Sequence, residues 1–162
     1  MLPVTPGHGK RSLWLVPEKA ETAALQRLID TLATRCGGPC FPPHVTLCSG
    51  IAEGSNADLS LSQLPLAAEL GGVQFGQEFF HACYLPVEPS EELRKLQERC
   101  ADAWQGKLPA HPPHSSLFYG ALGPEQQELA RNVAQAAPAQ LTLVRCELWQ
   151  TGGPVESWRQ LA

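Results

Sequence analysis

The sequence lacks a surplus of basic residues, a long apolar run and a recognisable secretory leader. Its 12 lysines and arginines are outnumbered by 16 aspartates and glutamates, which gives a formal charge of −4. A protein that holds a long nucleic acid contacts many phosphates and needs a basic surface, so this class is disfavoured. No segment approaches the roughly 18 consecutive apolar residues of a membrane span, and no charged N-terminal stretch precedes an apolar segment. We expect a soluble, cytoplasmic monomer that binds neither long nucleic acids nor membranes.

Charged residues are also scarce, at 17% of the chain, whereas hydrophobic residues make up 43%. Long polar tracts are absent, so the composition excludes an intrinsically disordered protein. A chain of 162 residues suffices for one domain that buries roughly two-thirds of its unfolded surface. We therefore expect a single domain over residues 1–162, with a mobile tail confined to residues 1–10.

The six cysteines do not form the pattern of a disulfide-rich or zinc-binding protein. A chain of this length can build a core without cross-links, and no secretory signal indicates an oxidising compartment. We expect free thiols, with a bridge between Cys36 and Cys40 across the CGGPC loop as the alternative. A zinc site of the paired-cysteine type needs a second closely spaced pair, which the sequence lacks.

The sequence does contain a repeat of six residues. The first motif is PPHVTL at Pro42–Leu47, and the second motif is PPHSSL at Pro112–Leu117. Alternate side chains of a strand share a face, so each motif presents one histidine and one hydroxyl on the same side: His44 with Thr46, and His114 with Ser116. Two such strands facing one another would surround one small volume with two imidazoles and two hydroxyls. That combination suits phosphate binding and proton transfer.

Hydrophobic periodicity predicts strands and helices in which strand, helix and motif strand follow the same order in both halves. The first half begins with a strand at 12–16, a helix at 18–36 and the first motif strand at 41–49. A further helix is expected at 58–70, although Pro65 would break or kink it.

In the second half, Ser90 predicts the N-cap of a helix, because two acidic residues and an apolar stripe follow it. The other expected elements are strands at 73–77, 79–87, 113–119 and 141–151, a helix at 124–137, and a strand at 155–161 that returns as a hairpin.

Three other interpretations of the motifs fit the sequence less well. Each motif taken alone is typical of an edge strand that begins after two prolines and carries a half-exposed histidine. The occurrence of two matched motifs favours a functional role over this structural one. A metal site at His111 and His114 is disfavoured, because neither motif contains an acidic residue and hydroxyls are poor zinc ligands. Ser49 and Ser115 are poor candidates for a hydrolase nucleophile, since no acid is placed to orient a base and no GxSxG elbow occurs.

The two remaining histidines receive no function at this point. His8 lies in the expected tail, and His81 has no partner that recurs in the other half.

The motifs and their flanks resemble the two-histidine phosphoesterase superfamily, whose signature is a pair of strands reading His, any residue, Thr or Ser, then an apolar residue. Within that superfamily, the chain is similar to the cyclic phosphodiesterases of plants and fungi that open ADP-ribose 1″,2″-cyclic phosphate. The similarity spans nearly the whole chain and is carried by SLWLVP at Ser12, FPPHVTL at Phe41, EFFHACYLP at Glu78, HPPHSSLFYGAL at His111 and CELWQTGGPVESW at Cys146.

This resemblance implies a bilobal α+β fold, with two pseudo-symmetric antiparallel sheets and outer helices around a U-shaped cleft. By motif match, the catalytic residues are His44 and His114, and the substrate-binding residues are Thr46, Ser116, Tyr119 and Trp14. The sequence departs from the family at Ser115, where an apolar residue is usual. Its side chain should face the core rather than the cleft.

The implied activity is the hydrolysis of a small cyclic phosphodiester: ADP-ribose 1″,2″-cyclic phosphate, a nucleoside 2′,3′-cyclic phosphate, or both. With an unperturbed pKa of about 6.5, one imidazole can act as base and the other as acid near neutral pH. No metal or organic cofactor is then required. Two alternatives stay open: an RNA-processing enzyme such as a 2′,5′ RNA ligase, phosphodiesterase or 3′-end exonuclease, and a non-catalytic nucleotide-binding module on the same fold.

Overall fold

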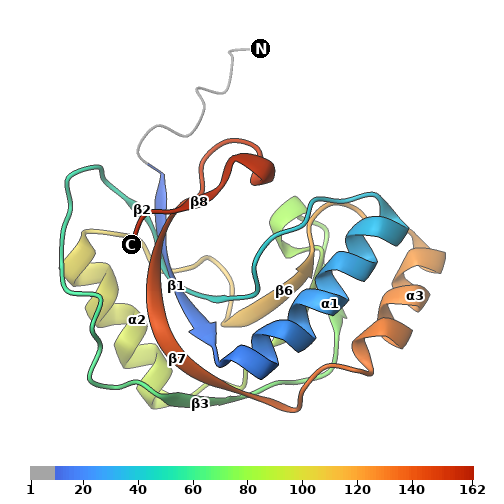
Figure 1. Ribbon diagram of the computed structural model, residues 1–162, viewed down its shortest axis with the longest axis horizontal. Helices are drawn as coiled ribbons and strands as arrows, with labels where there is room; N and C mark the ends of the chain where they lie inside the picture. Colours follow the sequence, from blue (N-terminus) through green and yellow to red (C-terminus); the bar gives the residue numbers. More distant parts are fainter. Residues whose placement is uncertain (1–9) are drawn as a thin grey trace.

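A computed structural model describes residues 10–162 of the chain (Figure 1). The expected tail and His8 therefore lie outside the described residues, apart from Lys10. The order of elements is β1 (Arg11–Pro17), α1 (Lys19–Cys36), β2 (Val45–Ile51), β3 (Leu66–Glu69), β4 (Gln74–Phe75), η1 (Phe79–His81), β5 (Cys83–Pro86), α2 (Glu91–Trp104), β6 (His114–Phe118), α3 (Pro124–Ala134), β7 (Gln140–Gln150), η2 (Val155–Ser157) and β8 (Arg159–Gln160).

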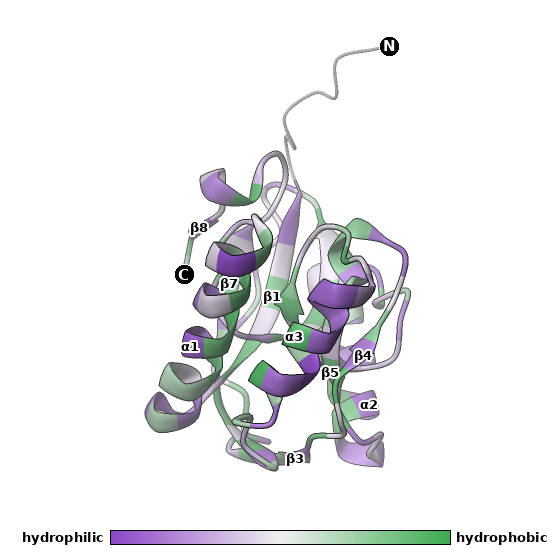
Figure 2. Cartoon of the chain, turned by 90° about the vertical axis from the view of Figure 1, so that its right-hand side faces the viewer, coloured by the Kyte–Doolittle hydropathy of each residue, from purple (hydrophilic) through white to green (hydrophobic). Residues whose placement is uncertain are grey.

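The strands of the described part form one antiparallel sheet with the order β3-β7-β1-β2-β6-β5-β4, and β8 pairs with β7. Helices α1 and α3 pack against each other on one side of the molecule, and α2 packs against β2 on the other (Figure 1). Hydrophilic residues predominate along α3, on the outside (Figure 2). The α+β prediction is confirmed, but the strands join into one sheet where two were expected.

The two halves of this sheet meet at a single point. β2 and β6 are connected by one residue pair, Val45 opposite Ser115, whereas β1 pairs with β7 along its whole length. The halves nevertheless repeat each other: Trp14 on β1 lies opposite Thr46, and Tyr84 on β5 lies opposite Ser116. Each motif strand therefore has an aromatic neighbour beside its hydroxyl.

The two helices with the clearest sequence signals, α1 and α2, form where the sequence predicts them. In α1 the buried stripe is made by Leu25, Leu28, Ile29, Leu32 and Ala33, and the helix ends at Gly37. Gly37 has a φ of 75°, a left-handed conformation that glycine adopts without steric cost. In α2 the Ser90 hydroxyl accepts a hydrogen bond from the Leu93 N–H at 3.1 Å, so the predicted N-cap is confirmed.

The helix predicted at 58–70 is wrong. This segment contains no helix and ends in β3, where burial alternates with a period of two: Leu66 and Ala68 are buried, and their neighbours are exposed. β3 pairs with β7 from Leu66 opposite Leu143 to Glu69 opposite Gln140. Apolar residues at this spacing fit a half-buried strand once a partner strand is present, and Pro65 opposes a continuous helix.

Other boundaries shifted because prolines and turns interrupt the strands. The motif strands begin at Val45 and His114, after the Pro-Pro pairs, since proline has no N–H for a sheet hydrogen bond. β2 also continues past Gly50, where the sequence predicts its end. The single strand expected at 79–87 is instead the short helix η1 followed by β5. The helix expected at 124–137 ends earlier, at Ala134. The strand expected at 155–161 is instead the short helix η2 followed by β8.

All six cysteines are free thiols, as predicted, and Cys36 and Cys40 are not bridged. Within residues 10–162, no helix combines the length and hydropathy that crossing a bilayer requires.

Candidate active site

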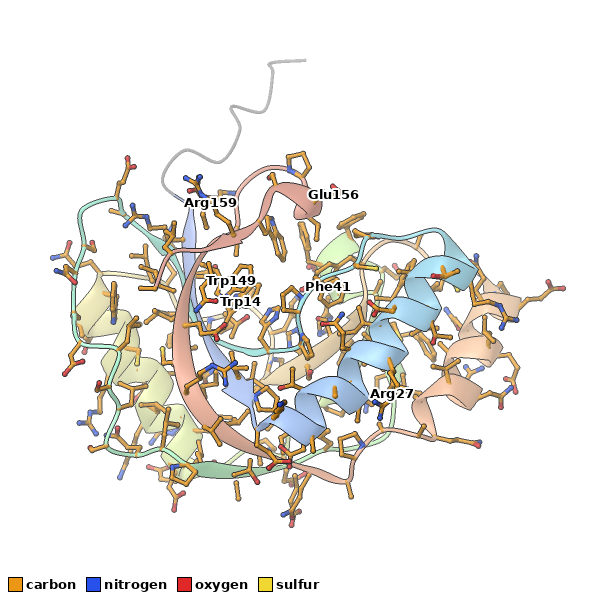
Figure 3. The ribbon with its side chains drawn as sticks, in the orientation of Figure 1. Trp14, Arg27, Phe41, Trp149, Glu156 and Arg159 are labelled. Carbon is orange, nitrogen blue, oxygen red and sulfur yellow. The ribbon has the colours of Figure 1, made fainter. Side chains whose placement is uncertain are left out.

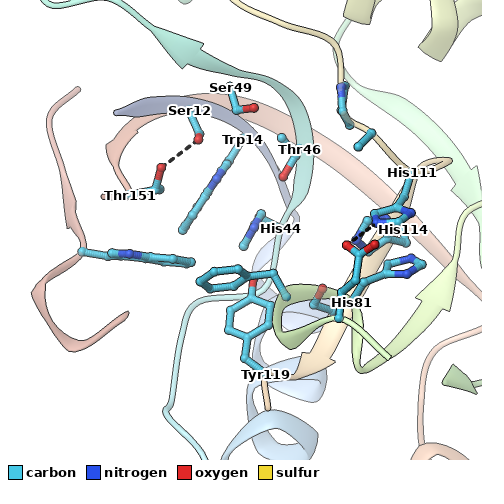
Figure 4. Close-up of a pocket in the computed structure, with 16 residues that line it drawn as sticks. Ser12, Trp14, His44, Thr46, Ser49, His81, His111, His114, Tyr119 and Thr151 are labelled. Carbon is cyan, nitrogen blue, oxygen red and sulfur yellow. Dashed lines mark hydrogen bonds and ion pairs between the residues drawn. The ribbon is translucent and has the colours of Figure 1, made fainter. Parts of the chain in front are cut away.

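A pocket of about 290 Å³ opens where the two motif strands meet (Figure 4). Its volume is at the lower end of the range for small-molecule sites, so a compact ligand fits it. All six site residues predicted from the sequence line this pocket: Trp14, His44, Thr46, His114, Ser116 and Tyr119. The structure thus brings the predicted residues together, while their roles stay predictions.

The antiparallel register explains why these side chains converge. Val45 and Ser115 form the pair that joins the two halves, and both are fully buried in the core. Alternation along a strand then directs the residues before and after them to the opposite face, which is the pocket. Thr46 follows Val45, and His114 and Ser116 flank Ser115, so both motifs present their histidine and hydroxyl to one pocket.

The register also accounts for Ser115, the departure from the family pattern. Its side chain faces the core, as expected, and is absent from the pocket lining. Its hydroxyl has no hydrogen-bond partner within residues 10–162.

The two motif histidines are held in the same way. Nδ1 of His44 lies 2.8 Å from the carbonyl oxygen of Pro42, and Nδ1 of His114 lies 2.8 Å from that of Pro112. A carbonyl oxygen can only accept, so Nδ1 is the donor in both rings. In the neutral imidazole, Nε2 is then left with a lone pair that can take a proton. The first proline of each motif therefore sets the tautomer of the histidine that follows.

Trp14 covers His44 and is itself backed by Trp149. Trp14 stacks on the imidazole with ring centroids 3.5 Å apart and an angle of 5° between the planes. Trp149 stacks on the other side of Trp14 at 4.5 Å, where β1 and β7 run side by side (Figure 3). The indole N–H of Trp149 donates to the buried carboxylate of Glu147 at 2.9 Å. His44 is consequently the end of a rigid three-ring stack.

The two motif histidines differ in how deeply they are buried. His44 is only 7% exposed, and burial lowers its pKa from 6.5 to about 4, although the hydrogen bond to Pro42 acts in the opposite direction. His114 is half-buried; burial also lowers its pKa, opposed by the hydrogen bond to Pro112 and assisted by the nearby His111. Desolvation disfavours the charged imidazolium, so His44 is held neutral at physiological pH.

A glutamine on α2 supports the first motif. Gln97 is buried, and its Nε2 donates to the carbonyl oxygen of Thr46 at 3.2 Å. Thr46 lies beside the single residue pair that joins β2 to β6, so Gln97 ties α2 to the strand at the point where the two halves meet. Gln97 was not predicted as part of the site, since it lies in the middle of a regular helix.

Tyr119 forms the floor beneath the motif residues. It is 4% exposed and stacks on Phe41 with ring centroids 3.9 Å apart. Burial raises the pKa of its phenol above the ordinary value of 10, so the hydroxyl keeps its proton at neutral pH.

Several pocket residues were missed by the sequence interpretation. His81, His111 and Glu78 lie on the side of His114, and the Glu78 carboxylate accepts a hydrogen bond from Nε2 of His111 at 2.9 Å (Figure 4). The remaining missed residues are Ser12, Ser49, Phe80, Pro109, Ala110, Thr151 and Trp158. The sequence suggests His111 only as a disfavoured metal ligand beside His114, and His81 reaches the pocket only through tertiary packing.

The polar groups of the pocket are hydroxyls and imidazoles. No lysine or arginine lines it, but four histidines and one glutamate do. Among residues 10–162, no group of three or more His, Cys, Asp and Glu side chains is arranged to hold a metal ion. The imidazoles are therefore the side chains of this lining that can carry positive charge against a bound anion.

Residues 10–162 match the sequence model of the family described as cyclic phosphodiesterase-like protein. A 2′,3′-cyclic-nucleotide 3′-phosphodiesterase of Kluyveromyces lactis is 25% identical, over 93% of this chain and 96% of that protein. A cyclic phosphodiesterase of Arabidopsis thaliana is 23% identical, over 93% of this chain and 92% of that protein. Among solved structures, the alignment with Kluyveromyces marxianus Usb1 covers 95% of this chain and 98% of the Usb1 chain, at 15% sequence identity and a TM-score of 0.36.

Proposed function

The chain belongs to the family of cyclic phosphodiesterase-like proteins, and on that premise we propose how it hydrolyses a small cyclic phosphodiester. It is a phosphodiesterase, like its relatives from Kluyveromyces lactis and Arabidopsis thaliana. Its substrates are ADP-ribose 1″,2″-cyclic phosphate, opened to the 1″-phosphate, or nucleoside 2′,3′-cyclic phosphates, opened to the 2′-phosphate. The pocket volume supports a compact substrate of this kind.

The observation that carries the proposal is the matched pair of imidazoles, each fixed at Nδ1 by a proline carbonyl. Each ring then offers Nε2 to the pocket, which is what general acid and base catalysis need. A module that only binds nucleotides needs hydroxyls and aromatic rings, but not two oriented proton-transfer groups. A long RNA substrate would need a basic groove, and the pocket contains no lysine or arginine.

His44 is the base and His114 the acid in this mechanism. Nε2 of the neutral His44 takes a proton from water as the water oxygen attacks phosphorus. One ring P–O bond breaks, and the leaving oxygen takes the proton from Nε2 of His114. Burial supports this assignment because it holds His44 neutral, whereas the less buried His114 gains its proton when the phosphate anion binds.

Thr46 and Ser116 bind the non-bridging phosphate oxygens. Their hydroxyls lie on the pocket face beside the two imidazoles and can donate as negative charge grows on phosphorus. Trp14 and Tyr119 close the pocket around the ring and limit its solvation. The two imidazoles supply both proton transfers, so we propose that turnover needs no metal ion.

Product analysis by phosphorus NMR tests the proposal. A panel of ADP-ribose 1″,2″-cyclic phosphate and nucleoside 2′,3′-cyclic phosphates reports turnover, substrate class and ring-opening direction together. We expect turnover of at least one ester in the presence of EDTA, and its loss by a factor of about 100 or more in His114→Ala. Full activity of a folded His114→Ala protein, or loss of activity on chelation that zinc restores, contradicts the mechanism.

A further inference from the structure

Glu147 on β7 is a buried acidic residue that does not line the pocket. It is 7% exposed, and among residues 10–162 it carries the only buried carboxylate. Burying a charge costs free energy unless hydrogen bonds and an opposite charge compensate it. A buried ion pair adds little net stability compared with well-packed apolar residues. The role of Glu147 therefore lies in what its carboxylate holds in place.

The two oxygens of this carboxylate accept from two different donors. Oε2 accepts from Nε of Arg145 at 2.7 Å, and Oε1 accepts from Nε1 of Trp149 at 2.9 Å. The Arg145 side chain is 56% exposed, so solvent screens the ion pair. Trp149 is only half-buried, and packing by itself leaves its ring room to turn. The hydrogen bond to Glu147 is what fixes the orientation of this indole.

The pairing of β1 with β7 connects Trp149 to the pocket. Trp14 lies directly opposite Glu147, and opposite residues of a sheet present their side chains on the same face. Trp149 stacks on Trp14 with ring centroids 4.5 Å apart and 17° between the planes (Figure 3). Trp14 in turn stacks on His44 at 3.5 Å and 5°. An unbroken series of contacts thus leads from the carboxylate to the imidazole.

His44 depends on this support because its other anchor is a single hydrogen bond. The bond from Nδ1 to the carbonyl oxygen of Pro42 fixes one atom of the ring, but the ring can still rotate about that bond. Trp14 lies flat on the imidazole and removes this freedom, so the direction of Nε2 follows the indole stack. His114 instead meets the ring of His81 edge-on, at 4.8 Å. The carboxylate therefore acts on one of the two motif histidines.

We propose that Glu147 is a positioning residue, which holds the imidazole of His44 in its orientation for proton transfer by way of Trp149 and Trp14. The inference rests on the proposed function, in which Nε2 of His44 takes a proton from the attacking water. Glu147 and Trp149 contact neither the water nor the phosphate in this scheme, since neither lines the pocket. Their effect falls on the rate of the chemical step rather than on substrate binding.

Two substitutions of Glu147 test the proposal with adenosine 2′,3′-cyclic phosphate as substrate. Glu147→Leu removes the acceptor of the Trp149 N–H. We expect it to lower kcat by about tenfold with little change in KM, because a misoriented base slows proton transfer. The NMR titration midpoint of His44 should rise from about 4 toward 6.5, because a loosened Trp14 admits water to the ring. Glu147→Gln keeps an oxygen that accepts from Trp149 and should restore both values.

A third variant tests the route through the indole. Trp149→Phe keeps an aromatic ring but removes the N–H that Glu147 accepts from. We expect the same loss of kcat and the same rise of the His44 midpoint as in Glu147→Leu. The double variant should lose no more than either single one, because both substitutions break one interaction. Losses that add would refute the route through Trp149.

The outcomes separate positioning from support of the sheet. If Glu147→Leu changes the urea unfolding midpoint but neither kcat nor the His44 titration midpoint, the carboxylate only stabilises β7, and the proposal is refuted. If Glu147→Leu does not fold, Trp149→Phe decides, since it leaves the pair of Glu147 with Arg145 in place. If the unmodified protein cleaves no cyclic phosphate, the proposed function fails. The His44 midpoints of the variants then decide the positioning role by themselves, and unchanged midpoints refute it.

Discussion

The burial of His44 predicts that this residue makes the stability of the protein depend on pH. Its pKa is lowered from 6.5 to about 4 in the folded chain. The unfolded chain therefore binds more protons between pH 6.5 and pH 4, and the free energy of unfolding falls as the pH falls through that window. Above pH 6.5 both states are neutral at His44, and this source of pH dependence vanishes.

The size of the effect follows from the shift. Each pKa unit corresponds to about 1.4 kcal/mol, and at pH 4.5 His44 is almost fully protonated in the unfolded chain but only partly in the folded one. The free energy of unfolding should therefore be about 2.5 kcal/mol lower at pH 4.5 than at pH 7.5 on account of His44 alone. That is a large share of the roughly 5–15 kcal/mol by which ordinary domains are stable.

A His44→Gln variant isolates this contribution, because the other titrating groups are common to both proteins. Urea unfolding followed by circular dichroism at pH 7.5 and pH 4.5 gives the free energies. We expect the unmodified protein to lose about 2.5 kcal/mol more than the variant over this interval. An NMR titration midpoint of His44 near 4 should accompany that difference. Equal losses, or a midpoint near 6.5, would refute the conclusion that Trp14 and its neighbours hold His44 neutral.

Three further predictions concern the surroundings of the histidines. Thr46→Val and Ser116→Ala should each lower kcat about 100-fold with a smaller change in KM, measured by steady-state kinetics, because each hydroxyl acts mainly on developing charge. Gln97→Leu should destabilise the protein by about 1–3 kcal/mol in urea unfolding, since the Thr46 carbonyl loses its buried donor. Ser115→Ala should leave kcat unchanged and raise stability by up to about 1 kcal/mol, because the lost hydroxyl has no partner within the described residues. A clear loss of stability in Ser115→Ala would mean that this hydroxyl has a partner, such as buried water.

Local pattern was sufficient for much of the fold. The apolar stripe from Leu25 to Ala33 and the cap at Ser90 locate α1 and α2, because helix periodicity and capping depend on residues a few positions apart. The same reasoning wrongly predicted a helix at 58–70. Leu66 and Ala68 pack as alternate residues of a strand only because β7, far away in the chain, pairs with them.

The sequence by itself predicted four of the polar residues that meet at the pocket. The repeated spacing of His and Thr or Ser, with strand alternation, places His44, Thr46, His114 and Ser116 on one face. Only the tertiary structure decided what distinguishes the two halves. Trp14 comes from β1 to stack on His44 and is backed by Trp149 of β7, while His114 meets the edge of the His81 ring. Desolvation depends on such distant neighbours, so a symmetric pair of motifs becomes a chemically unequal pair of imidazoles.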